Sequence, residues 1–146
     1  MRVWLFLLLI MFAGINSGCL RSLGTHAIQC AMVGEEKICF VREVWGFNGE
    51  NLSLTTDDNV CHKPSSENDY VSDRMRGDSV IFAKVVDGKF YVYAVPMEAP
   101  KNPFPVEVIL EPYNPATYFD RDFIKDGYQK FDLNEEKMTW CFNDIF

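Results

Sequence analysis

The side chains best suited to chemistry in this sequence are its cysteines and histidines. The five cysteines are Cys19, Cys30, Cys39, Cys61 and Cys141. His26 and His62 each lie near a cysteine, but neither takes part in the paired ligand spacing of a zinc site. Cysteines joined as disulfides would also be unable to bind a metal. The sequence therefore predicts no metal site and no metal cofactor.

Catalytic motifs are equally hard to find. The sequence holds no G-x-S-x-G nucleophile elbow and no glycine-rich phosphate loop. Cys61 and His62 are adjacent, but neighbours on a strand point to opposite faces and would not form a nucleophile with its base. Asp120, Asp122 and Asp126 depart from calcium-loop spacing, and no glutamate closes the loop. We expect no enzyme, no cofactor and no small-molecule substrate.

The first 18 residues have the pattern of an export signal. Arg2 precedes the apolar run Val3 to Phe12, and small residues up to Gly18 come before Cys19. The run is shorter than the roughly 20 residues that a membrane-spanning helix needs. We therefore expect residues 1–18 to be removed as a signal peptide.

An odd number of cysteines leaves one without a partner in an exported chain. The junction Ser17-Gly18-Cys19 resembles the lipobox of bacterial lipoproteins, although Asn16 stands where that motif usually has Leu, Ile or Val. The resemblance implies that Cys19 carries a lipid and that residues 19–24 form a tether. Ordinary cleavage after Ser17 or Gly18, with Cys19 left as a thiol, is the alternative.

The elements that would position the other four cysteines begin with a hairpin. Thr25 to Val33 and Glu36 to Glu43 are predicted strands, and Gly34-Glu35 suits a type II′ turn between them. Pairing Val33 with Glu36 places Cys30 opposite Cys39, because each lies three residues from the turn.

Four cysteines permit three disulfide connectivities. The hairpin register favours a Cys30–Cys39 bridge, which leaves Cys61 to pair with Cys141. The alternative is that Cys30 or Cys39 crosses the core to Cys61 or Cys141. Either arrangement would stabilise a small domain by a few kcal/mol per bridge.

The strongest fold signal is Val80 to Val95, in which β-branched and aromatic runs flank Asp87-Gly88. This pair suits the type I′ turn of a two-residue hairpin. The predicted core face is Ile81, Ala83, Val85, Phe90, Val92 and Ala94. The opposite face carries Phe82, Lys84, Tyr91 and Tyr93, which we predict to be a candidate protein-binding patch. A second sheet or the proline-rich segment from Pro96 to Pro105 could cover this face instead.

Further strands follow from turn signals and alternation. Asn48-Gly49 leads into Leu52 to Thr56, which would complete a three-stranded meander, and Val106 to Glu111 alternates as a half-buried strand. Between them, Asp57 to Gly77 is a long polar loop. Such loops are either contact surfaces or plain surface connections.

The C-terminal third is predicted to contain one short helix and a closing hairpin. Asn114-Pro115 and Asp126-Gly127 are helix start and stop signals. Tyr128 to Leu133 and Lys137 to Phe142 would pair with each other, with Trp140 and Phe142 in the core.

These elements predict a mainly β fold, a small antiparallel β-sandwich or meander with at most one short helix and stapled by disulfides. With 146 residues, of which 14% are aromatic, the chain can fill one modest core. Residues 25–146 are expected to form a single β domain.

Charge and resemblance suggest the kind of partner. The net charge of −7 becomes −8 once Arg2 is lost with the leader, which disfavours nucleic acid and would steer a basic protein partner. The leader, the Gly18-Cys19 junction and the strand Lys37 to Val41 together resemble small bacterial envelope lipoproteins. Some of these are similar to periplasmic immunity proteins that neutralise toxins delivered by type VI secretion.

The resemblance implies an exported protein anchored to the membrane by its lipid, facing the periplasm and binding another protein. That partner would be a toxin or an envelope component. One alternative is a structural or assembly component of the bacterial envelope. Another is a secreted eukaryotic binding protein, because Asn51-Leu52-Ser53 is a glycosylation acceptor sequence.

Overall fold

The computed structural model describes residues 23–45, 49–72, 80–94, 96–114, 121–133 and 139–142. Its strands are β1 (Leu23–Val33), β2 (Glu36–Trp45), β3 (Gly49–Thr55), β4 (Tyr70–Ser72), β5 (Val80–Val86), β6 (Lys89–Ala94), β7 (Val108–Pro112), β8 (Gln129–Asp132) and β9 (Thr139–Phe142). The predicted signal peptide and Cys19 lie outside the described residues. Residues Leu23 and Gly24 of the predicted tether belong to β1.

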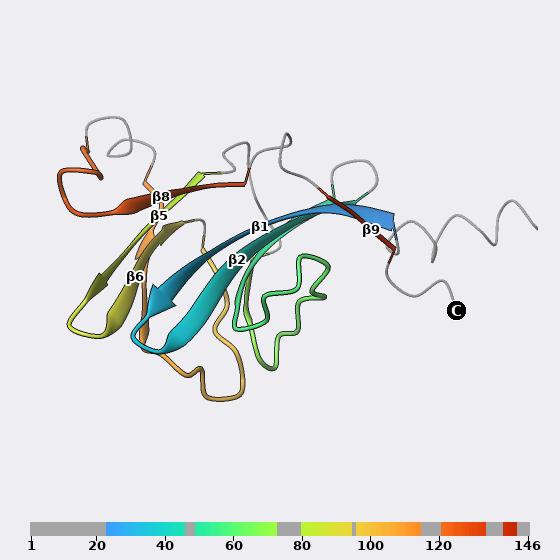
Figure 1. Cartoon of the computed structure of the whole chain (residues 1–146), viewed down its shortest axis with the longest axis horizontal. Coiled ribbons are helices and arrows are strands. Elements are labelled where there is room, and N and C mark those ends of the chain that lie inside the picture. The colour runs from blue at the N-terminus through green and yellow to red at the C-terminus, as the bar shows by residue number, and fades with distance from the viewer. Residues whose placement is uncertain are drawn as a thin grey trace, which may run out of the picture.

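Two sheets contain all of these strands (Figure 1). One has the order β4-β3-β2-β1-β9 and the other the order β7-β6-β5-β8. β6 and β7 are parallel, so the second sheet is mixed, while every other strand pair is antiparallel. The prediction of a mainly β fold is confirmed. No helix in the described part of the chain has the length and hydropathy to cross a membrane.

The two sheets enclose one apolar core, because strand alternation gives each sheet an apolar inner face. The five-stranded sheet contributes Phe40, Leu52 and Leu54, and the four-stranded sheet contributes Phe90 and Phe131. The ring of Phe40 lies 5.8 Å from that of Phe90 and 5.0 Å from that of Phe131. Aromatic pairs of this kind contribute about 1 kcal/mol beyond the area they bury.

Both predicted two-residue hairpins have the predicted register. Val33 pairs with Glu36 and Val86 with Lys89. Asp87 and Gly88 have φ angles of 51° and 76°, as a type I′ turn requires. One core prediction is wrong: Val85 is 45% exposed, because the hairpin end borders an open cavity instead of the facing sheet.

The predicted closing hairpin is also wrong. β8 pairs with β5 in one sheet, whereas β9 pairs with β1 in the other. Alternation identifies a strand but not its neighbour, so the two strands looked like a pair in sequence. Trp140 is 65% exposed and not in the core, because β9 lies at the edge of its sheet, beyond the strands that contribute core residues. The side chain of Phe142 is not described.

The described part of the predicted helical segment forms one turn and no helix. The N–H of Tyr128 donates to the carbonyl of Phe123 at 2.9 Å, and that of Gly127 donates to Ile124 at 3.0 Å. Gly127 has φ 81°, so it ends the turn as a Schellman glycine. The predicted stop signal is therefore confirmed, while residues 115–120 lie outside the description.

Candidate functional site

The predicted binding patch lies on the outer face of the four-stranded sheet, but part of it is covered. Residues 121–128, which we call the Phe123 cover, fold back over this face. Phe123 stacks on Phe82 with ring centroids 4.2 Å apart, and its ring lies 4.7 Å from that of Tyr93. Tyr93 is only 4% exposed. The patch predicted at Phe82, Lys84, Tyr91 and Tyr93 is therefore not an open aromatic surface.

Cations hold the Phe123 cover in place. Arg121 lies over the rings of Phe123 and Tyr128 at 4.9 and 5.0 Å, and donates to Glu111 and Asp126 at 3.0 Å each. Lys84 lies 4.2 Å from the centre of the Tyr128 ring and donates to the Asp126 carbonyl. Cation–π contacts and charged hydrogen bonds fix this segment against the sheet.

The charges in this network are not arranged for proton transfer near neutral pH. Burial and a hydrogen bond to Glu111 raise the pKa of Tyr128 to about 12. Burial alone would raise the pKa of Glu111, but hydrogen bonds from Tyr128 and Arg121 lower it. Tyr128 thus keeps its proton and Glu111 its charge, whereas a general acid or base needs a pKa near the working pH. The network is suited to holding the cover.

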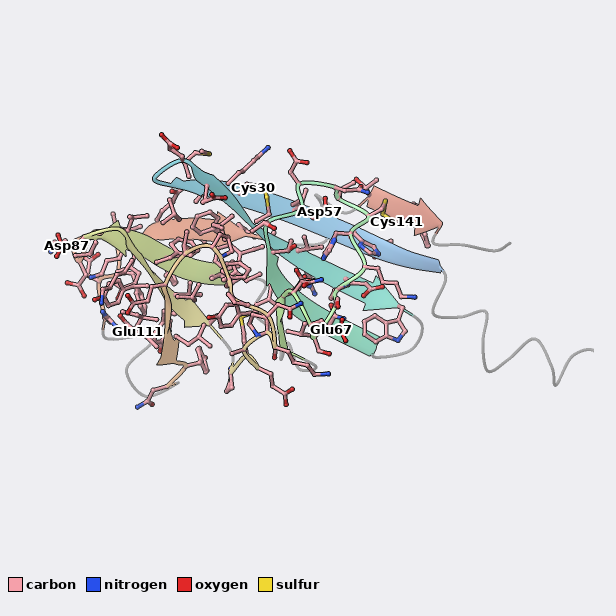
Figure 2. All side chains as sticks on the ribbon, turned by 90° about the horizontal axis from the view of Figure 1, so that it is seen from below. Cys30, Asp57, Glu67, Asp87, Glu111 and Cys141 are labelled. Carbon is pink, nitrogen blue, oxygen red and sulfur yellow. A yellow bond between two sulfur atoms is a disulfide. The ribbon has the colours of Figure 1, made fainter. Side chains whose placement is uncertain are left out.

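A second cover crosses the outer face of the five-stranded sheet. Residues 56–69, which we call the Cys61 cover, are tied to β9 by the Cys61–Cys141 disulfide. Figure 2 shows Asp57 and Cys141 on the same side of this sheet. Beneath the cover the strands present buried polar side chains: His26, Glu43, Asn51, Ser53 and Thr55.

His62 is the centre of the Cys61 cover. Its Nδ1 lies 2.8 Å from Asp57 and its Nε2 lies 2.8 Å from Asp69, which is 3% exposed. Both ring nitrogens can donate only in the imidazolium form. The hydrogen bond to Asp69 raises the pKa of His62. Burial lowers this pKa, but the hydrogen bond to Asp57 raises it further, and the net effect is an increase. Burial alone would raise the pKa of Asp69. Its hydrogen bonds, of which the one from His62 has the largest effect, lower the pKa instead.

His26 is fully buried below this cover. Neither ring nitrogen has a hydrogen-bond partner among the described residues, and Nε2 lies 3.6 Å from Glu43. Burial lowers the pKa of His26, and Glu43 partly offsets that effect. A neutral imidazole is therefore favoured. The described residues hold no group of three potential metal-binding side chains, and Cys61 is oxidised, so it is no nucleophile.

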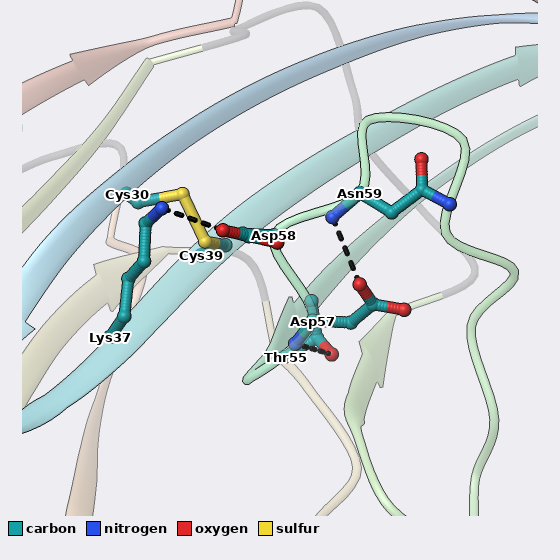
Figure 3. Close-up of a disulfide and its surroundings, with 7 residues drawn as sticks. All are labelled: Cys30, Lys37, Cys39, Thr55, Asp57, Asp58 and Asn59. Atoms are coloured by element: carbon teal, nitrogen blue, oxygen red, sulfur yellow. Dashed lines mark hydrogen bonds and ion pairs between the residues drawn. A yellow bond between two sulfur atoms is a disulfide. The ribbon is translucent and has the colours of Figure 1, made fainter.

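The disulfide pairing agrees with the connectivity that the hairpin register favoured. Cys30 is bonded to Cys39 and Cys61 to Cys141. Figure 3 shows the first bridge, with the ion pair between Lys37 and Asp58 beside it at 2.8 Å. That ion pair ties the start of the Cys61 cover to β2.

A site that the sequence did not reveal lies where the β1–β2 and β5–β6 hairpins end. Both hairpins project to the same end of the molecule (Figure 1). Met32, Val85 and Val86 are 58%, 45% and 40% exposed. Met32 and Val85 line one open cavity of about 360 Å³. An exposed apolar cluster beside a cavity is typical of a binding surface. In the sequence, the feature that indicates this site is the presence of apolar residues next to each hairpin turn.

Comparisons with protein-family models, curated protein sequences and solved structures found no match for this chain. The fold and the surfaces described above therefore carry the functional argument. The two covers lie on the outer faces of the sheets, and the hairpin ends bring three exposed apolar side chains together beside a cavity.

Proposed function

We propose that this chain is a non-enzymatic exported lipoprotein that binds another protein at the cell envelope. The observation that carries the proposal is the exposed apolar cluster of Met32, Val85 and Val86 beside the open cavity. Burying such side chains against a partner is favourable by roughly 25 cal/mol per Å² of apolar surface. The position of the cluster at two hairpin ends leaves it accessible to a large partner.

The disulfides support a location outside the cytoplasm. All four cysteines of the described residues are paired, and structural disulfides are rare where glutathione and thioredoxin keep thiols reduced. The leader 1–18 would direct export, and a lipid on Cys19 would hold the domain at the membrane, facing the periplasm.

The specific role that we favour is neutralisation of a toxin. An inhibitor needs an accessible binding surface and a rigid scaffold, and needs no catalytic group of its own. The net charge of −7 would speed association with a basic partner. The eukaryotic alternative is less well supported, because Asn51 is 6% exposed and its Nδ2 donates to Glu43 at 3.2 Å.

The second candidate is a structural or assembly component of the envelope. The observation that favours it is the later part of β1. Beyond the four residues paired with β9, no described strand pairs with this edge of β1, and an unpaired edge can join a strand of another subunit. The gene neighbourhood separates the two roles. A toxin gene beside this one supports neutralisation, and an envelope-assembly operon supports the structural role.

Intact mass tests the localisation. The full chain is expressed in bacteria from its own leader, extracted from membranes and weighed with and without reduction. A mass that fits cleavage before Cys19, a lipid adduct and two disulfides is expected, and Cys19→Ser should release the protein from the membrane. An unlipidated protein with a free thiol at Cys19 contradicts the lipoprotein assignment.

Growth tests the neutralising role. The product of the adjacent gene is directed to the periplasm, with and without the full chain. We expect the chain to restore growth, and a version lacking residues 1–18 to fail because it stays in the cytoplasm. Equal growth with both versions, or no toxicity to relieve, contradicts this role.

A further inference from the structure

Among the described strands, only β9 pairs with the edge of β1 that faces away from β2, and it pairs with four residues. In an antiparallel ladder, Cα atoms of non-hydrogen-bonded pairs lie about 4.5 Å apart and those of hydrogen-bonded pairs about 5.5 Å apart. The Cα atoms of Cys30 and Cys39 are 4.0 Å apart, so the backbone N–H and C=O of Cys30 point away from β2. By alternation, those of Ile28 and Met32 do the same.

β9 occupies the beginning of this same edge. It pairs antiparallel with β1 from Leu23 to His26. Beyond that point, the strand pairings of the described residues provide no partner for the outward backbone groups of Ile28, Cys30 and Met32. The edge therefore already accepts one antiparallel strand and continues past its end.

The second sheet presents an open edge opposite this one. β8 pairs with β5 and is the last strand of its sheet. The N–H of Asp132 points away from β5 and donates to Oε1 of Gln29 on β1 at 2.9 Å. Because backbone groups two residues apart share a side, those of Lys130 also point toward β1. The side chain of Gln29 thus bridges the edge of β1 and the edge of β8. An inserted strand could provide backbone pairing at the same place.

The cavity lies at this opening. β1 contributes Cys30, Ala31 and Met32 to its lining, and the facing sheet contributes Ala83, Val85 and Phe131. Ala83 and Phe131 belong to the core, so the cavity leads from the exposed hairpin ends to the interior. Its volume of about 360 Å³ has room for an apolar side chain.

We propose that this opening binds an extended segment of a partner protein, which adds a strand to β1 in line with β9. The strand pairs with the outward backbone groups of Cys30 and Met32, and alternate apolar side chains enter the cavity, because side chains of a strand alternate in direction. An extended segment is the occupant because it alone supplies both the backbone partners and the inserted side chain. The inference rests on the proposed protein-binding function and names its surface.

The probe is a phage-displayed library of linear dodecapeptides, selected on the folded domain and followed by synthesis of the enriched peptides. Alternating apolar residues are expected in the enriched sequences. Bound peptide should slow amide exchange at Cys30 and Met32. A scrambled peptide of the same composition is the control for sequence.

Two matched pairs of variants locate the peptide. Val85→Asp places a charge in the cavity and should weaken binding by at least about tenfold. Ile124→Asp adds the same charge at a 63% exposed residue outside the cavity lining and should change binding by about twofold or less. Met32→Pro removes an outward N–H that no ladder bond between described strands uses, and it should weaken binding more than Met32→Ala, which loses only part of the side chain.

Each outcome decides the proposal. Loss of binding in Val85→Asp and Met32→Pro, with a smaller loss in Met32→Ala and retention in Ile124→Asp, supports it. If Met32→Pro fails to fold, the comparison of Val85→Asp with Ile124→Asp and the exchange data decide alone. Failure to enrich peptides overturns it, as does binding that Val85→Asp leaves unchanged. A dimer that protects the Cys30 and Met32 amides without peptide overturns it in favour of a second copy. Toxin neutralisation that survives Val85→Asp leaves the proposed function standing and removes only this surface.

Discussion

The two covers fold over opposite outer faces of the sandwich and are held by different physical means. The Phe123 cover lies on aromatic rings and is fixed by stacking and by Arg121. The Cys61 cover lies on buried polar side chains and is fixed by a disulfide and by His62 between two carboxylates. Apolar packing needs no covalent help, because burial itself is favourable. A polar layer gains less from burial, so its cover depends on a covalent bond and on charge.

The comparison also explains which surface is left for a partner. Each cover occupies the outer face of one sheet, and Met32 and Val86 at the hairpin ends stay exposed, although Gly127 of the Phe123 cover borders the cavity beside Met32. The rigid covers fix the strands from outside, while the hairpin ends keep apolar groups in solvent. The proposed binding surface therefore lies at the end of the sandwich and not on its faces.

The largest effect should come from the disulfide of the Cys61 cover. The Cys61–Cys141 bridge closes 80 residues and the Cys30–Cys39 bridge closes 9. The chain-entropy relation gives about 4.5 kcal/mol for the first and about 2.5 kcal/mol for the second. We expect paired Cys→Ser changes to lower the free energy of unfolding in urea in that order. Equal losses would contradict the difference in loop length.

Removing the central ring of the other cover should have the next largest effect. Phe123→Ala deletes a 4% exposed ring that contacts Phe82, Tyr93 and Tyr128. We expect a loss of about 3 kcal/mol, because truncation of a buried Phe removes transfer energy and leaves a cavity. Ile124→Ala is the matched control at a 63% exposed neighbour and should cost less than about 0.5 kcal/mol. Thermal or urea unfolding of both variants measures the difference.

The polar part of the Phe123 cover should contribute less. Tyr128→Phe removes the hydroxyl that bonds to Glu111 and Arg121 and should cost about 1.5 kcal/mol, the size of a hydrogen bond to a charged group. Tyr91→Phe on the neighbouring strand is the control. Ultraviolet titration should also show that Tyr128→Phe removes a phenol with a pKa of about 12. If both variants are as stable as the wild type, the hydroxyl contributes nothing to the cover.

The smallest effect should be the pH dependence of the Cys61 cover. Because the folded state raises the pKa of His62, its contribution is fully present below the unfolded value of about 6.5 and is lost as pH rises through the folded value. His26 acts in the opposite direction, since its lowered pKa costs stability as pH falls below about 6.5.

The variant His62→Gln distinguishes the pH dependence due to His62 from that due to His26. The wild type should gain up to about 1 kcal/mol relative to this variant as pH falls from the alkaline side of the titration to its acid side. His26→Gln serves as the comparison, and NMR titration of the two imidazoles should place their pKa values on opposite sides of 6.5. A difference between wild type and His62→Gln that does not vary with pH would show that the imidazolium does not hold the cover.

Turn chemistry explains what was predictable from sequence. A two-residue turn fixes the register of its hairpin, so Gly34-Glu35 and Asp87-Gly88 set the strand pairing and the Cys30–Cys39 bridge. The partners of β8 and β9 were not predictable, because alternation describes a strand and not its neighbour. Phe119 and Phe123 have helical spacing, which does not distinguish a helix from the single turn that covers Phe82.

The candidate site was the hardest part to predict. The alternation that placed Phe90 in the core also placed Val85 there, yet Val85 borders an opening. That opening lies between β1 and the facing sheet, and the relative position of the two sheets depends on contacts between distant strands. No local pattern around Val85 contains that information.

The pairing of β1 with β9 has a consequence for how the domain is made. A ribosome produces Leu23–Val33 among the first residues of the domain and Thr139–Phe142 among the last. The first strand therefore has no partner on this edge until β9 has been synthesised. Contacts between distant parts of a chain also form slowly. The Cys61–Cys141 bond has the same dependence, because Cys141 lies on β9 and the bond can form only after that strand is made.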